Sequence, residues 1–318
     1  MPAYRKPALN FTLLLILLFI LPHVVQAQRE QVLLQEIIQT YQVIAEAYTK
    51  GANTTSLTAQ LNQIIDTVLN KKKTTTDTYT ITLQLVNIRE EARKLGEEAQ
   101  NAAFWNNILL ALTVIAVAST VAGIYYLLFT KRKIWEIWLK LRRDNTIIVR
   151  KKKAKRSSML LDEEVQAVLA AIIIVIIVFA TTQYFTAGRV VEPFSELGLL
   201  GEKMKIGDYP TNLIEGEEAK VYIYVGNHMG KPMLYQIQAK LGNKTTPIDP
   251  APIQPFWTHY LVLEHNQTTI IPLHFTINQT GTHRLIVELW AYNQTTGTIQ
   301  YHHRWVQLWI NVTPLLKP

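Results

Sequence analysis

Cysteine is absent from this chain of 318 residues. The absence excludes disulfide bonds, thiolate metal sites and cysteine nucleophiles. Every folded part of the protein must therefore be stabilised by side-chain packing, hydrogen bonds and ion pairs alone.

Charge is absent from two long apolar stretches, residues 107–129 and 165–187, which contain no Asp, Glu, Lys, Arg or His and no proline. Each stretch exceeds the roughly 20 residues with which a helix crosses the hydrocarbon core of a bilayer. We therefore predict two transmembrane helices that contact membrane lipids. Ion pathways and transport sites need polar or charged groups inside the membrane, so two plain spans do not predict a transporter.

Glycosylation sequons are absent from the segment between the two stretches, residues 130–164, which contains a dense run of basic residues. From Lys131 to Arg156 there are twelve basic and two acidic residues, a net charge of +10 against +8 for the whole chain. Such a run also occurs in nucleic-acid sites, but a short basic loop between two spans defines the cytoplasmic side. We interpret it as a cytoplasmic loop and expect no nucleic-acid partner.

Asn-x-Thr sequons occur at six places outside this loop and outside the N-terminal leader, at Asn53, Asn243, Asn266, Asn278, Asn293 and Asn311. Such an asparagine accepts a glycan only on an exported surface. The sequons therefore predict that the segments before the first span and after the second span are both extracellular and glycosylated.

Residues 1–27 predict a secretory signal peptide. Two basic residues precede an apolar run from Phe11 to Leu21, and small residues at positions 25 and 27 suit cleavage after Ala27. The run is short for a membrane span, and an uncleaved signal anchor is the alternative. In both cases the chain from residue 28 onward emerges outside, which predicts a multi-pass protein of the cell membrane with both folded segments extracellular.

Residues 28–103 predict an extracellular helical stalk, built as a hairpin or small bundle. Its first apolar stripe steps by three and four along Leu34, Ile37, Tyr41, Ile44 and Tyr48. A second helix is expected from about Ser56 to Leu69, and a third from near Thr78 that runs without a proline into the first span. Two interpretations stay open: the stripe serves self-association or a partner, or the bundle buries its own stripe.

The chain from residue 213 to 318 changes to the period of β-strands. Six stretches are short, largely alternating and divided by turn residues: 219–225, 234–241, 259–263, 269–275, 283–291 and 305–312. They predict an immunoglobulin-like β-sandwich with Trp290, Trp305 and Trp309 in its core, preceded by a juxtamembrane linker at 188–212. The expected fold class is therefore a membrane protein of the α+β type.

Distinctive motifs follow the second span. They are Val191-Glu-Pro-Phe-Ser-Glu-Leu-Gly-Leu-Leu-Gly201, Gly207-Asp-Tyr-Pro-Thr-Asn-Leu213 and Val225-Gly-Asn-His-Met-Gly-Lys-Pro232. From about residue 165 to 312 the chain resembles the family of archaeal membrane proteins designated domain of unknown function 1616. The resemblance implies an archaeal source and a surface-exposed sandwich after a transmembrane helix. It implies no activity, because the function of the family is unassigned, and it leaves out the N-terminal helices.

No catalytic residue, cofactor site or metal site is predicted. Four carboxylates lie close together in sequence after the second span, namely Glu192, Glu196, Asp208 and Glu215. Paired carboxylates can act on sugars, but we expect no cleft around a linker. The histidines of the predicted sandwich lack the spacing of zinc ligands: His228, His259, His265, His274, His283, His302 and His303. No Ser/His/Asp elbow, phosphate loop or nucleotide motif is present.

Together these patterns predict a non-enzymatic archaeal cell-surface protein that presents a glycosylated sandwich and a helical stalk for adhesion, envelope anchoring or partner assembly. The expected partners are membrane lipids, a surface-layer or envelope protein, and further copies of the chain in a homo-oligomer. The alternative is an accessory subunit of an envelope enzyme or secretion complex, in which the sandwich presents or gates a substrate.

Overall fold

The computed structural model describes residues 8–71, 78–126, 138, 163–186 and 192–315. It contains two compact units, one made of residues 1–102 together with 190–318, and one made of residues 103–189. Most of the predicted basic loop, residues 130–164, lies outside the described residues.

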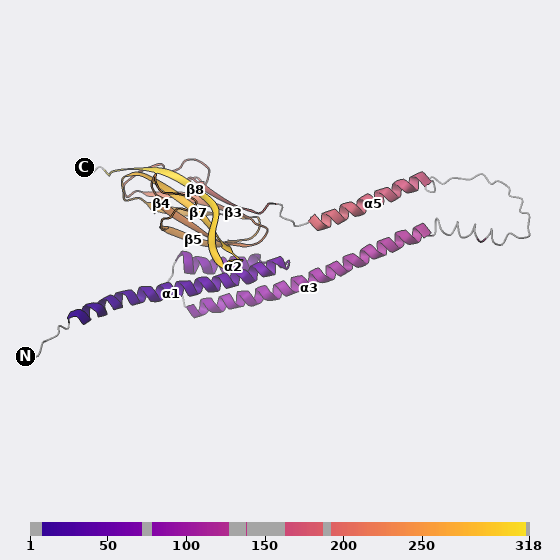
Figure 1. Cartoon of the computed structure of the whole chain (residues 1–318), viewed down its shortest axis with the longest axis horizontal. Coiled ribbons are helices and arrows are strands. Elements are labelled where there is room, and N and C mark those ends of the chain that lie inside the picture. Colours follow the sequence, from indigo (N-terminus) through magenta and orange to yellow (C-terminus); the bar gives the residue numbers. More distant parts are fainter. Residues whose placement is uncertain (1–7, 72–77, 127–137, 139–162, 187–191, 316–318) are drawn as a thin grey trace, which may run out of the picture. The chain divides into compact units, whose positions relative to one another are not determined.

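Helices form the N-terminal part of the first unit (Figure 1). They are α1 (Ala8–Thr49), α2 (Thr55–Ile65) and α3 (Thr78–Tyr125), and α2 continues directly into a π-helix, η1 (Asp66–Asn70). The predicted second and third helices are thus confirmed. α1 begins inside the predicted signal segment and continues without a break to Thr49. It is followed by Gly51, whose φ of +91° suits a residue without a side chain.

The predicted stripe of α1 is buried. Ile37, Tyr41 and Ile44 are fully enclosed, while Leu34 and Tyr48 are half-buried. All but Tyr48 share one apolar cluster with residues of α2 and α3, among them Leu57, Leu61, Ile65, Ile81, Leu85 and Ile88. The apolar stripes of the three helices therefore face a common core.

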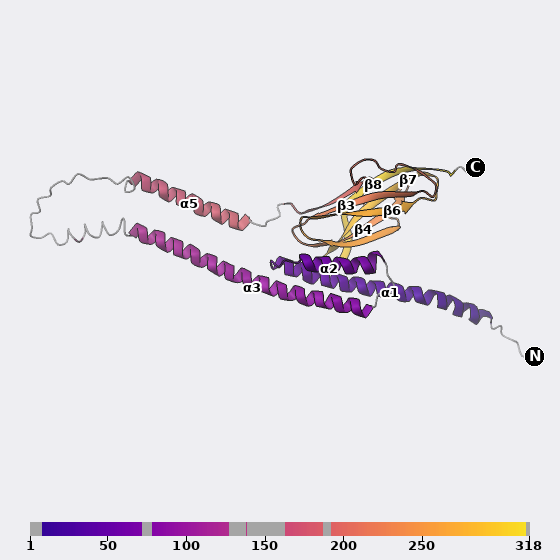
Figure 2. The ribbon, with the colours of Figure 1, turned by 180° about the vertical axis from the view of Figure 1, so that it is seen from behind.

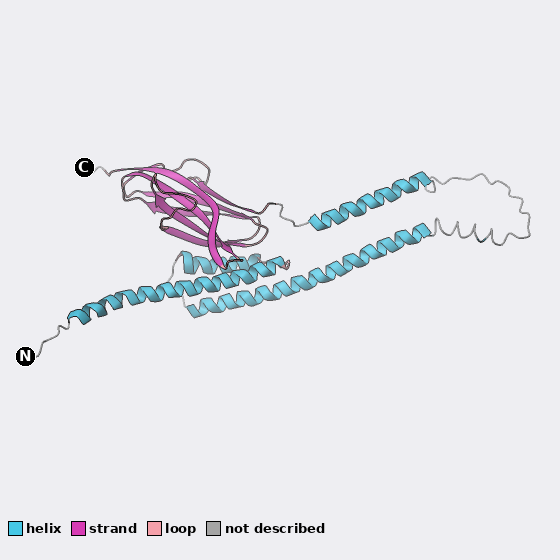
Figure 3. Ribbon diagram, in the orientation of Figure 1, coloured by secondary structure: helices cyan, strands magenta, loops and turns pink. Residues whose placement is uncertain are grey.

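Strands form the C-terminal part of the same unit (Figure 3). They are β1 (Phe194–Leu200), β2 (Asn212–Ile214), β3 (Glu218–His228), β4 (Met233–Gly242), β5 (Trp257–Leu263), β6 (Gln267–Thr276), β7 (Gly281–Asn293) and β8 (Thr298–Thr313). One sheet has the order β1-β3-β6 and the other β2-β8-β7-β4-β5. All pairs are antiparallel except β2 with β8. This arrangement confirms a two-sheet β-sandwich.

Alternate residues of the long strands fill the space between the two sheets. On β4, Tyr235, Ile237 and Ala239 belong to this core, while Leu234 points to the other face and joins the helical cluster. Val262 of β5 and Tyr292 of β7 do the same. The five-stranded sheet is therefore covered on both faces, by the three-stranded sheet on one side and by helices on the other (Figure 2).

The helical segment is consequently part of one folded unit with the sandwich rather than a separate stalk. Neither interpretation of its stripe anticipated this packing, because the partner surface comes from strands that follow more than a hundred residues later in the same chain. The helices bury their own stripes and, in addition, the outer face of β4, β5 and β7.

The predicted linker, residues 188–212, is wrong over much of its length. β1 lies inside it and pairs with β3 from Phe194↔His228 to Leu200↔Tyr222. Leu199 of this strand is buried in the sandwich core. A proline and two glycines around a short apolar pattern concealed the strand, and the sandwich begins at Phe194 instead of residue 213.

The expectation that three tryptophans fill the core is also wrong. The core residues of β8 are Leu308, Ile310 and Val312, so the odd-numbered Trp309 faces outward and is 39% exposed. The guanidinium of Arg284 lies 4.9 Å from the centre of its ring. Trp290 and Trp305 are half-buried and lie outside the core cluster.

The second unit contains the end of α3 and helix α5 (Glu163–Thr186). Among the described residues, one helix is long and apolar enough to cross a membrane, with its span at Thr78–Thr120. The most apolar part of that helix has none of its residues buried by the protein, unlike the core helix of a globular domain. α5 contributes a shorter apolar stretch, Ile174–Gln183.

Candidate functional site

The six sequon asparagines all belong to the first unit. Asn53, Asn243, Asn266, Asn278 and Asn311 are exposed, and Asn293 is half-buried. Several have local turn bonds, as at Asn243, whose Oδ1 accepts from the Thr245 amide at 3.0 Å and the Thr245 hydroxyl at 2.8 Å. Asn311 instead lies within β8. Their surface positions suit the predicted modification, which stays a prediction.

The four carboxylates considered from the sequence do not form a catalytic pair in the described structure. Glu192 and Glu215 are exposed, and Asp208 lies in a turn with a φ of 52° and pairs with Lys203 at 3.1 Å. Glu196 alone enters a polar cluster, on β1. The motif therefore builds a strand and a turn.

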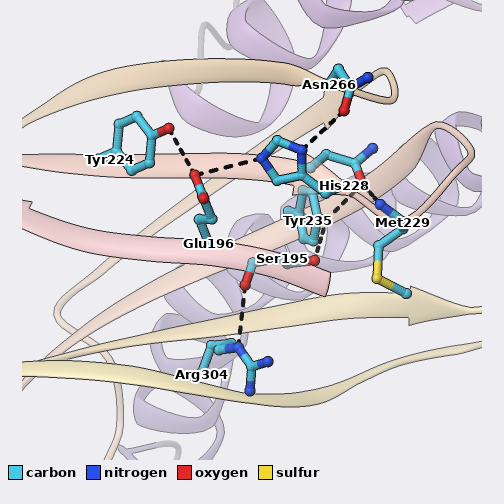
Figure 4. Close-up of polar contacts among 9 residues, drawn as sticks. Ser195, Glu196, Tyr224, His228, Met229, Tyr235, Asn266 and Arg304 are labelled. Carbon is cyan, nitrogen blue, oxygen red and sulfur yellow. Dashed lines mark hydrogen bonds and ion pairs between the residues drawn. The ribbon is translucent and has the colours of Figure 1, made fainter. Parts of the chain in front are cut away.

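A polar cluster surrounds the start of β1 (Figure 4). Glu196 Oε2 accepts a hydrogen bond from the Tyr224 hydroxyl at 2.8 Å and lies 3.6 Å from His228 Nε2. The other nitrogen of that ring lies 3.0 Å from Asn266 Oδ1, and Phe194 stacks on the ring at 4.6 Å. These contacts join β1, β3 and the turn before β6.

Ser195 connects the two sheets within this cluster. Its hydroxyl lies 2.6 Å from the Tyr235 hydroxyl and 2.9 Å from His302 Nε2, and its carbonyl accepts from Arg304 Nε at 3.2 Å. Burial, followed by the positive charge of Arg304, lowers the pKa of His302 below its ordinary value. Burial likewise raises the pKa of the Tyr235 hydroxyl.

Sequence reasoning missed this serine–histidine contact, because Ser195 and His302 are far apart in the chain. A nucleophilic serine needs a base, a group that orients the base, and access for a substrate. Ser195 is only 2% exposed, and the described residues place no carboxylate on the second nitrogen of His302. The contact therefore supports the sandwich and does not form a catalytic dyad.

The histidines are dispersed over the sandwich. Within the described ranges, no three His, Cys, Asp or Glu side chains gather as a metal site would require. His259 stacks on Trp257 with the rings 5.4 Å apart, and burial lowers its pKa from 6.5 to about 4. His274 instead lies 3.0 Å from Glu218 on the surface.

The largest set of long-range polar contacts lies between the helices and the sandwich. The side-chain amide of Asn62 donates to the Val262 carbonyl at 2.7 Å and accepts from the Val262 amide at 2.7 Å. Asn70 binds Tyr260 in the same way, at 3.0 Å and 2.8 Å. Because β5 is the last strand of its sheet, the two asparagines occupy the hydrogen-bonding positions of a missing neighbouring strand.

The π-helix explains how both asparagines reach one strand. Over eight residues a regular α-helix turns about 80° beyond two full turns, which would direct the second side chain elsewhere. The wider turn of η1, with hydrogen bonds from residue i to i+5, takes up this rotation. A local departure from α-helical geometry thus serves the contact with β5.

Glu264 holds the N-terminus of α2. Its carboxylate accepts hydrogen bonds from the hydroxyls of Thr54 at 2.7 Å, Thr55 at 2.8 Å and Thr58 at 3.2 Å, and the residue is 8% exposed. The positive end of the helix dipole favours a carboxylate at this place.

α1 adds a third contact. The hydroxyl of Tyr41 donates to the Pro232 carbonyl at 3.0 Å, and its ring meets the edge of Tyr292 at 5.7 Å. Burial raises the pKa of this hydroxyl to about 12, so it stays a donor at neutral pH. The candidate functional region is therefore the composite surface where helices and sandwich meet.

Family comparison finds a match to the C-terminal part of the chain. Residues 189–311 match the model of a domain of unknown function, DUF1616. The match confirms the resemblance stated from the motifs. The DUF1616 match contains β1 to β7 and most of β8, and it leaves out the helices that cover β4 and β5.

Several solved structures are similar to part of the chain. The CARDB domain of the PF1109 protein from Pyrococcus furiosus, in complex with di-metal ions, is 10% identical, with 38% of this chain and 89% of that chain covered and a TM-score of 0.28. A β-glucosidase from Listeria innocua is 15% identical over 38% of this chain and 16% of its own, also with a TM-score of 0.28. An α2-macroglobulin fragment from Escherichia coli is 12% identical, covers 40% and 17%, and has a TM-score of 0.27. No curated protein matches.

Proposed function

We propose that this protein is a non-enzymatic cell-surface protein, anchored by two membrane-spanning helices, that presents one composite extracellular module for adhesion, envelope anchoring or assembly with a partner. The module combines the N-terminal helices with the DUF1616 sandwich. The two spans are the end of α3 and α5, joined by the basic loop on the cytoplasmic side.

One observation carries this proposal: residues 28–102 and 192–315 share a hydrophobic core. Tyr41 binds the turn before β4, Asn62 binds β5, and Leu234 and Val262 lie in the helical cluster. Two segments that share a core must lie on the same side of a membrane. The chain between them therefore crosses an even number of times, and its two apolar stretches supply two crossings.

Charge and sequons support the orientation. The segment between the apolar stretches carries a net charge of +10 from Lys131 to Arg156, typical of a cytoplasmic loop. All six sequons of the mature chain lie in the shared unit, mostly on exposed residues. Exposed apolar side chains of α3, such as Leu109 and Ile115, at 62% and 61%, suit contact with lipid.

A non-enzymatic role agrees with the chemistry of the described sites. The serine–histidine contact is buried, the carboxylates of the β1 motif are apart, and Glu264 at the helix–sheet boundary holds the start of α2. Presentation of a stable extracellular surface is the activity that such a module supplies.

Labelling of single cysteines tests the topology, since the natural chain has no cysteine and gives no background. Lys94→Cys and Lys244→Cys place a thiol on exposed positions of α3 and of the sandwich, and Ser157→Cys places one in the basic loop. A membrane-impermeant maleimide should label the first two on intact cells and the third only after lysis. Labelling of Lys94→Cys and Lys244→Cys on different sides would overturn the proposal.

A further inference from the structure

A cleft of about 530 Å³ opens where α1, η1 and the sandwich meet. Glu30, Gln31 and Leu34 line it from α1, and Leu69 and Asn70 line it from η1. The sandwich contributes Gln236, Pro255, Phe256, Trp257, Thr258 and Tyr260. The cleft exists only because the helices pack on the DUF1616 sandwich, and its α1 residues lie after the predicted cleavage site.

Aromatic rings form one wall of the cleft. Phe256 lies immediately before β5 and Tyr260 lies within it, and both side chains line the cleft. The Phe256 ring also lies 6.4 Å from the ring of Phe275 at the sandwich core. Phe256 is 48% exposed, so part of its ring is open to a ligand. Trp257 borders the same cleft, with one face of its ring against His259.

Polar side chains with few hydrogen bonds among the described residues also line the cleft. Glu30, Gln31 and Thr258 make no side-chain hydrogen bond with any described residue. The hydroxyl of Tyr260 accepts from Gln236 Nε2 at 2.7 Å, and its own proton has no acceptor among the described residues. The residues that line the cleft thus include a carboxylate, an amide and two hydroxyls.

Charge restricts the ligand. Glu30 is the one charged residue among those that line the cleft, so phosphate, sulfate and acidic sugars are disfavoured. A flat apolar wall rimmed by hydrogen-bonding groups fits a pyranose ring, whose C–H face packs on an aromatic ring while its hydroxyls bond to amides, hydroxyls and carboxylates. The volume is sufficient for one or two such rings.

We propose that this cleft binds a neutral pyranose residue of a glycan, with Phe256 as the stacking platform and Gln31, Thr258 and Tyr260 as hydroxyl partners. The biological role of this binding rests on the proposed surface function. In that function the glycan is the partner that the extracellular module contacts. The glycan belongs either to the envelope of the cell or to an N-linked chain of the protein itself.

Titration of the full chain in lipid nanodiscs tests this proposal, with the protein made in a host that adds no N-glycans and kept free of sugar-based detergents. The probes are mannobiose, maltose, cellobiose and chitobiose, with a hyaluronan disaccharide as the acidic comparison. Calorimetry measures the binding, and tryptophan fluorescence supports it. We expect saturable binding of at least one neutral disaccharide with a Kd of about 1 mM, and weaker binding of the acidic one.

Variants assign the binding to the cleft. Phe256→Ala and the double variant Gln31→Ala/Thr258→Ala should each weaken binding by about 10-fold or more, because they remove the platform or the unpaired polar groups. Phe194→Ala is the matched control, since this phenylalanine is also largely exposed, at 43%, but lies on β1 outside the cleft. It should bind as the parent does.

Two results would overturn the assignment: no saturable binding of any neutral disaccharide, or binding that Phe256→Ala and the double variant leave unchanged. The same titration on glycosylated protein separates the sources of the glycan. If the glycosylated protein does not bind the disaccharide and enzymatic deglycosylation restores the binding, the ligand is the protein's own glycan. If the glycosylated protein still binds the disaccharide, the ligand is an external glycan. Failure of the sugar titration leaves the cysteine-labelling result untouched, so the two proposals fail separately.

Discussion

Asn62 and Val262, 200 residues apart in the chain, exchange two hydrogen bonds of 2.7 Å between a side-chain amide and a peptide group. Asn70 and Tyr260 repeat the arrangement one step along the same strand. Edge strands expose such peptide groups to other chains, and proteins cover them to prevent association. Here the edge of β5 is covered by helices that precede both apolar stretches in the sequence, whereas β5 follows them.

Replacement of these asparagines should destabilise the module in a graded way. Val262 is fully buried, so Asn62→Ala leaves its N–H and C=O without partners, and we expect a loss of about 2–3 kcal/mol in the free energy of unfolding. Tyr260 is half-buried and water can reach its peptide group, so Asn70→Ala should cost about 1 kcal/mol. Thermal unfolding in nanodiscs, followed by tryptophan fluorescence, measures both.

Asn87→Ala supplies the control for this series, because Asn87 is exposed on α3 and its side chain makes no hydrogen bond with the described residues. Its unfolding should match the parent. If Asn62→Ala and Asn87→Ala unfold at the same temperature, the paired hydrogen bonds contribute nothing to stability, and apolar contacts alone hold the edge of β5.

Glu264 should be more sensitive to truncation than to neutralisation. Glu264→Ala removes the acceptor of three threonine hydroxyls and leaves two of them, those of Thr54 and Thr58, buried without it, which should cost about 2–3 kcal/mol. Glu264→Gln keeps one acceptor oxygen and should cost less. Hydrogen exchange of α2 amides reports the effect locally, and equal protection of α2 in both variants and in the parent would show that the carboxylate does not anchor this helix.

Periodicity alone predicted most elements. The three-and-four spacing of Ile37, Tyr41 and Ile44 identified α1, and alternation identified β3 to β8. β1 was missed because Pro193 and Gly198 are typical of a linker. The alternating pattern of Leu197 and Leu199 on either side of Gly198 was too short to outweigh them. Pairing with β3 outweighs the low strand propensity of this segment.

The helix–sheet boundary was not predictable in the same way. One signal was present, since β7 reads as the nearly continuous apolar run Leu285 to Ala291, and a strand of that kind is covered on both faces. Nothing in the sequence shows which segment supplies the second cover. Asn62 and Asn70 look like ordinary polar helix residues, and their role follows only from contacts across two hundred residues of chain.

The buried ion pair of Lys240 and Glu288 should show the cost of an unpaired charge. Its atoms are 2.7 Å apart, with side chains 4% and 0% exposed, and both residues also bind the backbone of Ala251 in the loop between β4 and β5. Lys240→Met leaves the carboxylate buried without its cation and should cost about 3–5 kcal/mol. Thermal unfolding measures the loss.

Addition of Glu288→Gln to that variant should recover part of the stability, because the remaining buried group is then neutral and still accepts from the Ala251 amide. Lys244→Met, at an exposed position, controls for the loss of a lysine. Suppose that Glu288→Gln lowers the stability of Lys240→Met as much as it lowers the stability of the parent. The two side chains then act independently, and the loss in Lys240→Met does not come from breaking the ion pair.

His259 should make the module less stable in acid. Burial lowers its pKa from 6.5 to about 4 in the folded state, with only partial compensation by the negative charge of Asp66. Asn70 Nδ2 at 3.4 Å and the stacked Trp257 complete its surroundings. Between these two pKa values the unfolded chain binds more protons than the folded one, so stability is full above pH 6.5 and falls as the pH drops toward 4.

The expected loss from this histidine is about 1–2 kcal/mol, since each pKa unit corresponds to about 1.4 kcal/mol and solvent at the half-buried ring reduces the full amount. His259→Gln cannot titrate, so its stability should fall less than that of the parent over the same range, whatever its stability at neutral pH. His283→Gln, on the surface of β7, is the matched control and should follow the parent. Parallel pH curves for the parent and His259→Gln would mean that the folded protein accepts the proton at this ring without penalty, and that another group is responsible for any acid sensitivity.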